Sequence, residues 1–177
     1  MKLAWASKDE YGAHYEYLGD HVGKMLKMWK EKYKSVYEAV LRRVIGEDAD
    51  AMIRSAIIFH DTGKLVRIYQ EYLKGKLGEI EPIKLKGYRH EIVSAAIVTL
   101  VLCERPWVDY VSAAVLLSHE PMLMGQVGAI HERYFTLTQA LRILRLAAEK
   151  GDKGEIIRLE PDGVEELNEI MRKEGFP

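Results

Sequence analysis

The chain has 177 residues, which is enough for one domain with a sizeable core and too few for two full-sized domains. Its 26 basic and 27 acidic residues give a net charge of −1. The overall charge therefore does not indicate a nucleic-acid partner, and binding to nucleic acid would require a local basic patch. The single cysteine, Cys103, stands in an apolar run and is expected to be a small buried side chain rather than half of a disulfide. The N-terminus does not resemble a signal peptide, and no uncharged apolar run approaches the roughly 20 residues of a membrane span, so the chain is expected to act in the cytoplasm.

Apolar side chains at helical spacing predict an all-α fold. After a short polar start, helices are expected at about residues 18–29, 33–44, 49–60, 65–73, 89–102, 108–118, 136–150 and 164–173. Glycine and proline predict a loop over residues 74–87 and a loop or lid over 122–134. Residues 155–159 form a short β-like run, and Pro161-Asp162-Gly163 is a turn signal. We expect one domain over residues 1–150 and a short C-terminal extension, 151–177, packed on it.

The stretch Ile57-Ile58-Phe59-His60-Asp61-Thr62-Gly63-Lys64 places a histidine and a carboxylate side by side where a helix is expected to stop. His60 lies on the same helical stripe as Ile57 and Ile53, so its imidazole is expected to point into the core. Gly63 is the predicted helix terminator. Because an unpaired buried imidazole or carboxylate costs several kcal/mol, the His60-Asp61 pair needs partners.

Three further histidines share this placement. His21, His60, His90 and His119 fall near the ends of four separate expected helices, each on the apolar stripe. Any one of them alone is more often a core residue with an ordinary hydrogen-bond partner than a metal ligand. Four buried imidazoles, however, need four sets of partners, whereas a single metal centre satisfies them together. Asp61 fits such a centre, because imidazole and carboxylate ligands suit a divalent transition ion or Mg²⁺.

The order of these residues resembles the HD phosphohydrolase superfamily, with the local phrases His60-Asp61-Thr62-Gly63-Lys64, Arg89-His90-Glu91 and Leu117-Ser118-His119-Glu120. Within it the chain is most similar to the stand-alone HD nuclease of type I CRISPR interference in its archaeal form, over about residues 18–120. The resemblance implies an HD-domain helical bundle in which five residues bind metal: His21, His60, Asp61, His90 and His119. It also implies catalytic roles for Asp61 and for Lys64, a positive charge near the scissile phosphate.

The resemblance further implies metal-dependent hydrolysis of phosphodiester bonds in single-stranded DNA, with one or two ions of Mn²⁺, Ni²⁺, Co²⁺ or Mg²⁺ as cofactors. A nuclease of this kind works beside a separate helicase subunit and a CRISPR effector complex, and this chain has no phosphate-binding loop motif of its own. Two positions depart from the family pattern: Glu120 stands where many members have a second histidine, and the helix expected at 136–150 lacks a late aspartate. Glu149 and Asp152 are candidate replacements, so the number of ions stays open.

Two other functions fit the same residues. An HD-type nucleotide or cyclic-nucleotide phosphohydrolase would use the same ligands around a closed pocket, whereas a nuclease would use an open basic groove. A non-catalytic subunit of an effector complex would keep the fold and lack the metal.

Two groups of residues near the N-terminus would suit nucleic acid, namely five lysines and three tyrosines: Lys24, Lys27, Lys30, Lys32, Lys34, Tyr11, Tyr15 and Tyr17. A solvated helix face and an anchor for the N-terminus are the simpler interpretations of these two groups. His14 and His131 are expected at the surface, although His131 in the lid would be placed to meet substrate.

Overall fold

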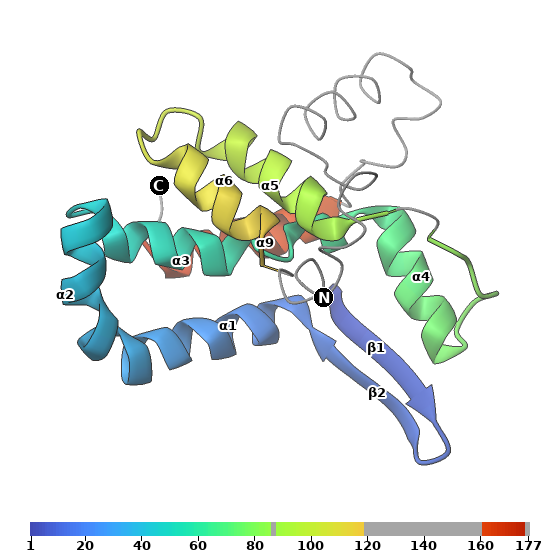
Figure 1. Cartoon of the computed structure of the whole chain (residues 1–177). Helices are drawn as coiled ribbons and strands as arrows, with labels where there is room; N and C mark the ends of the chain where they lie inside the picture. The colour runs from blue at the N-terminus through green and yellow to red at the C-terminus, as the bar shows by residue number, and fades with distance from the viewer. Residues whose placement is uncertain (86–87, 119–160, 176–177) are drawn as a thin grey trace, which may run out of the picture.

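The computed structural model describes residues 1–85, 88–118 and 161–175. Within these ranges the chain is helical apart from one hairpin, so the predicted all-α fold class is confirmed (Figure 1). The elements in chain order are β1 (Leu3–Asp9), β2 (Gly12–Tyr17), α1 (Leu18–Met28), a π-helical segment (Trp29–Tyr33), α2 (Lys34–Ile45), α3 (Ala49–Phe59), a 3-10 turn (Thr62–Leu65), α4 (Arg67–Leu77), α5 (His90–Val101), α6 (Val108–Leu116) and α9 (Pro161–Lys173).

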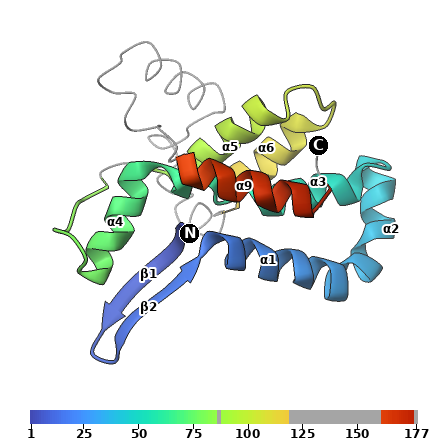
Figure 2. The same cartoon turned by 180° about the vertical axis from the view of Figure 1, so that it is seen from behind.

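The N-terminal hairpin was not predicted, because the sequence indicated only a short polar start. β1 and β2 pair in antiparallel register, with Ser7 opposite His14. One face of β1 is apolar, and its Leu3 and Ala6 pack against Leu73 and Leu77 of α4. Figure 2 shows the hairpin projecting from the helices with α4 beside β1. An isolated two-stranded hairpin is marginal in water, so α4 is what stabilises this one.

Gln70 of α4 fastens the free edge of β1 to the helices. Its side-chain oxygen accepts a hydrogen bond from the backbone nitrogen of Leu3, and its side-chain nitrogen donates to the Leu3 carbonyl, each at 2.9 Å. The same nitrogen donates to the carbonyl of Lys64 at 2.8 Å. The hairpin is therefore tied directly to the turn that follows α3.

The main core lies between α1, α3, α5, α6 and α9. Its buried side chains include Leu18, Val22, Leu26, Met52, Ile58, Phe59, Ala95, Val98, Val111, Val115, Leu167 and Met171. The helix α9 lies against α1 and α3 on the side that faces the viewer in Figure 2. There the carboxylate of Glu166 accepts hydrogen bonds from the backbone nitrogens of Lys2 and Gly19, at 2.9 and 3.0 Å. This contact joins the C-terminal helix to the start of α1.

The helices expected at residues 18–29, 33–44, 49–60, 89–102 and 108–118 are confirmed to within a few residues. The loop expected over 74–87 was wrong at its start, because α4 continues to Leu77 and ends at Gly78, whose φ of +78° is the usual left-handed helix stop. Gly75 stays helical and serves close packing, since a Cβ there would lie 3.1 Å from the Cα of Pro82. The turn expected at 161–163 was also wrong, because α9 begins at Pro161, and proline is favoured at the first helical position.

Cys103 is exposed, contrary to the expectation of burial. It lies beyond the end of α5, where the apolar run no longer follows the inward-facing stripe of the helix. No helix among the described residues combines the length and apolar character that crossing a membrane would require. The expected lid at 122–134, helix at 136–150, β-like run at 155–159 and domain boundary at 150/151 all lie outside the described residues, and they stay predictions.

Candidate metal centre

The end of α3 places His60 and Asp61 next to each other, directly before the 3-10 turn. The helix ends at Phe59, and its last carbonyl accepts a hydrogen bond from the Thr62 hydroxyl at 2.9 Å. The turn that follows buries Asp61 almost completely, at 2 % exposure. A buried carboxylate requires charged or hydrogen-bonding partners close by.

Gly63 brings α5 to this turn. The predicted role of Gly63 as helix terminator was wrong, since α3 ends four residues earlier and Gly63 instead allows close packing. An added Cβ on Gly63 would overlap the backbone carbonyl group of His90, because it would lie only 2.9 Å from the carbonyl carbon. The backbone nitrogen of Gly63 donates to the Ser94 hydroxyl at 2.8 Å, and the Tyr88 hydroxyl donates to the Gly63 carbonyl at 2.5 Å. These contacts place His90 directly beside Asp61.

Four of the five predicted ligands meet here. Nε2 of His60 lies 3.3 Å and Nε2 of His21 lies 3.7 Å from Oδ2 of Asp61. Nε2 of His90 lies 3.3 Å from the other carboxylate oxygen, Oδ1. Ligand atoms of His21, His60 and Asp61 all lie within 4.8 Å of one another, close enough to surround one ion. The fifth predicted ligand, His119, lies outside the described residues, as do Glu120, Glu149 and Asp152.

The hydrogen-bond partners of two rings determine where their protons lie. His60 Nδ1 is 2.8 Å from the carbonyl oxygen of Ile57, and His21 Nδ1 is 3.0 Å from Oε2 of Glu16. Because these oxygens only accept hydrogen bonds, both Nδ1 atoms carry a proton, and in a neutral ring Nε2 then holds a lone pair. The two Nε2 atoms, 3.3 Å apart, face each other and the Asp61 carboxylate. A cation held between the two Nε2 atoms and the carboxylate would stabilise this arrangement.

The electrostatics of Asp61 favour the same cation. Burial by itself would raise the pKa of the Asp61 carboxyl, but the imidazoles of His60 and His90 and the ammonium group of Lys64 hold it well below its usual range. Lys64 Nζ donates to Oδ2 at 2.7 Å. Oδ1 is buried and makes no hydrogen bond within the described part of the chain. Asp61 is thus a buried anion whose Oδ1 faces Nε2 of His90, and this donor set of imidazole and carboxylate fits a divalent transition ion.

Several supporting residues were missed by the sequence analysis. Glu16 was missed because its position depends on the hairpin, which the sequence did not predict. Glu91 is 3 % exposed, pairs with Arg89, and has Oε2 3.6 Å from Nδ1 of His90. Its position directly after a candidate ligand was the available signal. Ser94 was visible only as a small residue one turn beyond His90.

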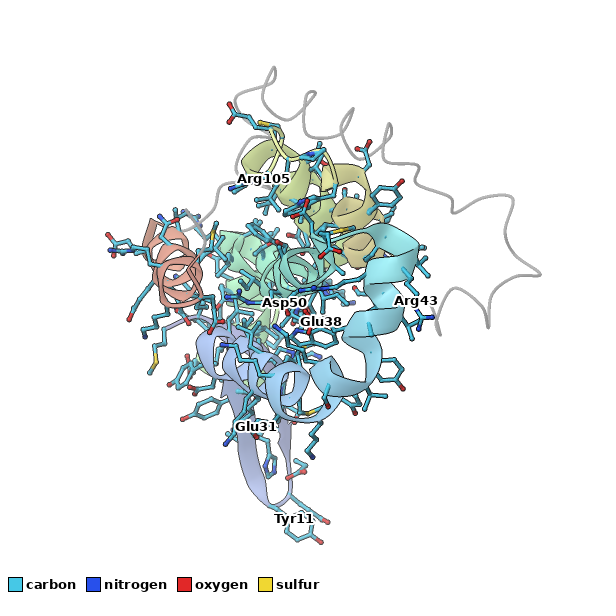
Figure 3. All side chains as sticks on the ribbon, turned by 90° about the vertical axis from the view of Figure 1, so that its left-hand side faces the viewer. Tyr11, Glu31, Glu38, Arg43, Asp50 and Arg105 are labelled. Carbon is cyan, nitrogen blue, oxygen red and sulfur yellow. The ribbon has the colours of Figure 1, made fainter. Side chains whose placement is uncertain are left out.

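The remaining candidates among the described residues are mostly exposed. Lys24, Lys27, Lys30 and Lys34 each pair with an acidic residue, which supports the interpretation of a solvated helix face. Tyr11 projects at the tip of the hairpin, away from the helices (Figure 3).

Tyr15 and Tyr17 contact each other edge to face, and Tyr17 packs near the cluster that joins β1 to α4. His14 is exposed and lies 3.2 Å from Asp9, whereas His131 is outside the described residues.

An apolar cavity adjoins the centre. It has a volume of about 530 Å³, and its walls come from α1, α2, α3 and α6. His60 forms part of the wall beside Ile57, Met25 and Tyr110.

Comparisons with known proteins single out one group of relatives. No family model matches the chain. The chain is 34 % identical over 139 residues to the CRISPR-associated endonuclease Cas3-HD of Pyrococcus furiosus, a match that covers 72 % of this chain and 56 % of the relative. It is 31 % identical over 138 residues to the Cas3-HD endonuclease of Methanocaldococcus jannaschii, covering 71 % and 54 %. The protein of the same name from Thermoproteus tenax is 35 % identical over 121 residues, covering 63 % and 46 %. The chain thus spans about half the length of the curated relatives it matches.

Proposed function

Because the chain is related to the archaeal Cas3-HD endonucleases, we propose that it is a metal-dependent nuclease that hydrolyses phosphodiester bonds of single-stranded DNA in CRISPR interference. In this proposal it works in the cytoplasm, beside a separate helicase subunit and a CRISPR effector complex. The observation that carries the proposal is the pair of imidazole Nε2 atoms, from His21 and His60, that face a buried anionic Asp61.

Named residues would perform separate parts of the reaction. His21, His60 and Asp61 would hold the ion. His90, which lies beside the second carboxylate oxygen of Asp61, and His119 are further proposed ligands. A bound divalent ion supplies an activated water and neutralises charge on the phosphoryl oxygens. Imidazole ligands favour Mn²⁺, Co²⁺ or Ni²⁺ over Mg²⁺, which prefers oxygen ligands and holds its water tightly.

Lys64 would supply positive charge to the substrate. Its side chain is 12 % exposed and its ammonium group is held by Asp61, so Lys64 lies at the metal centre without being fully buried. An ion bound to the same carboxylate would repel the ammonium group, since like charges a few ångströms apart interact strongly even at a protein surface. A DNA phosphate held at the ion would then be the natural partner for Lys64.

A second candidate is a nucleotide or cyclic-nucleotide phosphohydrolase. The cavity beside His60 favours it, because about 530 Å³ lies within the usual range for small-molecule sites. The third candidate, a non-catalytic subunit, would not require a set of imidazoles held in the ligand tautomer around an anion.

A hydrolysis assay separates these functions. The 177-residue chain would be incubated with end-labelled single-stranded DNA, duplex DNA, mononucleotides and cyclic nucleotides, each with Mn²⁺, Co²⁺, Ni²⁺ or Mg²⁺. We expect cleavage of single strands that needs an added ion and is absent in Asp61→Ala. Asp109→Ala, which removes an exposed carboxylate on α6, is the matched control and should cleave like the parent protein. Hydrolysis of nucleotides without cleavage of single strands would support the second candidate, and no hydrolysis with no bound metal would support the third.

A further inference from the structure

Glu16 of the N-terminal hairpin contacts the candidate metal ligand His21. Its Oε2 lies 3.0 Å from Nδ1 of His21, on the side of the ring opposite Asp61. We infer that Glu16 is a positioning residue, which fixes the tautomer and the direction of His21 so that Nε2 presents its lone pair to the ion. This inference rests on the proposed metal-dependent function and deepens it.

The carboxylate of Glu16 is itself held in place from several sides. Oε2 also accepts a hydrogen bond from the indole Nε1 of Trp5 at 3.0 Å, and Oε1 accepts one from Lys24 Nζ at 2.5 Å. The Glu16 side chain is only 15 % exposed, despite its place on a projecting hairpin. Both oxygens are therefore oriented by β1 and α1 together, and Glu16 cannot turn away from His21 without losing three partners.

The tautomer of His21 depends on this contact. A neutral imidazole carries one proton, and either nitrogen holds it when neither has a fixed partner. His60 obtains its partner from its own helix, since Ile57 lies one turn before it. His21 has no such local carbonyl contact and takes its acceptor from β2. Without Glu16, the proton of His21 would be free to move to Nε2, which would then be unable to bind an ion.

The hairpin therefore belongs to the metal centre, although it contributes no ligand. Carboxylates that accept a hydrogen bond from a metal-binding histidine hold its ring in place and increase its basicity. Their loss typically weakens metal binding about 10- to 100-fold. The same hairpin offers a matched control, because Asp9 Oδ1 lies 3.2 Å from Nε2 of His14 at an exposed site near the hairpin turn.

The test measures metal binding without DNA. Mn²⁺ affinity would be determined by calorimetry for the parent, for Glu16→Ala and for Asp9→Ala. We expect Glu16→Ala, which removes the acceptor of His21 Nδ1, to bind Mn²⁺ about 10- to 100-fold more weakly than the parent, and Asp9→Ala to bind within twofold of the parent. Nitrogen-15 spectra of the imidazoles would report the tautomer, with the His21 proton on Nδ1 in the parent and partly on Nε2 in Glu16→Ala.

A merely structural role gives a different pattern. Glu16→Ala would then lower the melting temperature of the metal-free protein, while Mn²⁺ affinity and the His21 tautomer would match those of the parent, and that result overturns the inference. If the parent and Glu16→Ala bind Mn²⁺ with equal affinity, the proposed function stands and only the role of Glu16 is removed. If the parent binds none of Mn²⁺, Co²⁺ or Ni²⁺, both the inference and the proposed function fail.

Discussion

Gly63→Ala tests the packing that brings His90 to Asp61. The new methyl group would overlap the His90 carbonyl oxygen and lie 2.9 Å from the carbonyl carbon, whereas ordinary van der Waals contact begins at 3.4 Å. The carbonyl carbon of His90 would need to move about 0.5 Å away from the new methyl group, and the carbonyl oxygen would need to move further. Both partners are backbone, so no side-chain rotation relieves the overlap, and the 3-10 turn and α5 must move apart.

The magnitude follows from the site geometry. Overpacking a buried contact typically costs about 1–3 kcal/mol, and a collision between backbones belongs at the upper end. For a chain of this size, 3 kcal/mol corresponds to a fall of about 6–12 °C in melting temperature. Metal ligands must keep their distances to within about 0.2 Å, so a shift of half an ångström at His90 should weaken Mn²⁺ binding at least tenfold.

Thermal unfolding with and without Mn²⁺, together with calorimetry, measures both effects. Gly23→Ala is the matched control, since a Cβ on that helical glycine of α1 meets no atom within 4 Å of the described chain. It should melt at or slightly above the parent, because alanine stabilises a helix interior by about 0.5–1 kcal/mol relative to glycine. A Gly63→Ala protein that melts with the parent and binds Mn²⁺ equally well would refute the view that Gly63 sets the position of His90.

Four further predictions concern single residues. Asp61→Ala should abolish DNA cleavage while circular dichroism shows the helical content retained, because the carboxylate supplies charge to an ion rather than packing; cleavage at the parental rate would contradict this. Lys64→Ala should lower turnover about 10²–10³-fold with metal content unchanged, as measured by single-turnover kinetics and metal analysis, and a variant as fast as the parent would make Lys64 a surface charge only. Ser94→Ala leaves the buried backbone nitrogen of Gly63 without its acceptor, so urea unfolding should show a loss of about 1–3 kcal/mol; no loss would mean that another acceptor replaces the hydroxyl. The hydrogen bond from Lys24 lowers the pKa of Glu16 to about 2 from an ordinary 4.5, so Glu16 contributes stability above pH 4.5 that disappears as the pH falls toward 2; acid melts of Glu16→Gln should lack this part of the pH dependence.

The sequence predicted most helices and the inward placement of the histidines because both depend on local periodicity. Apolar residues three and four positions apart mark the buried stripe of a helix wherever that helix packs. His21 and His60 lie on such stripes, which is why their convergence was predictable before the packing was known. The adjacent carboxylate of Asp61 then indicated that the bound group is a cation.

Only the tertiary structure decided which atoms face one another. The hairpin escaped prediction because its stability comes from α4, which lies some fifty residues later in the chain. Glu16 reaches His21 only once that hairpin has formed, and Gly63 reaches His90 only where the 3-10 turn crosses the start of α5. Periodicity assigns a side chain to a face, whereas the tautomer of an imidazole depends on one acceptor about 3 Å away, and in His21 a different element of the fold supplies that acceptor.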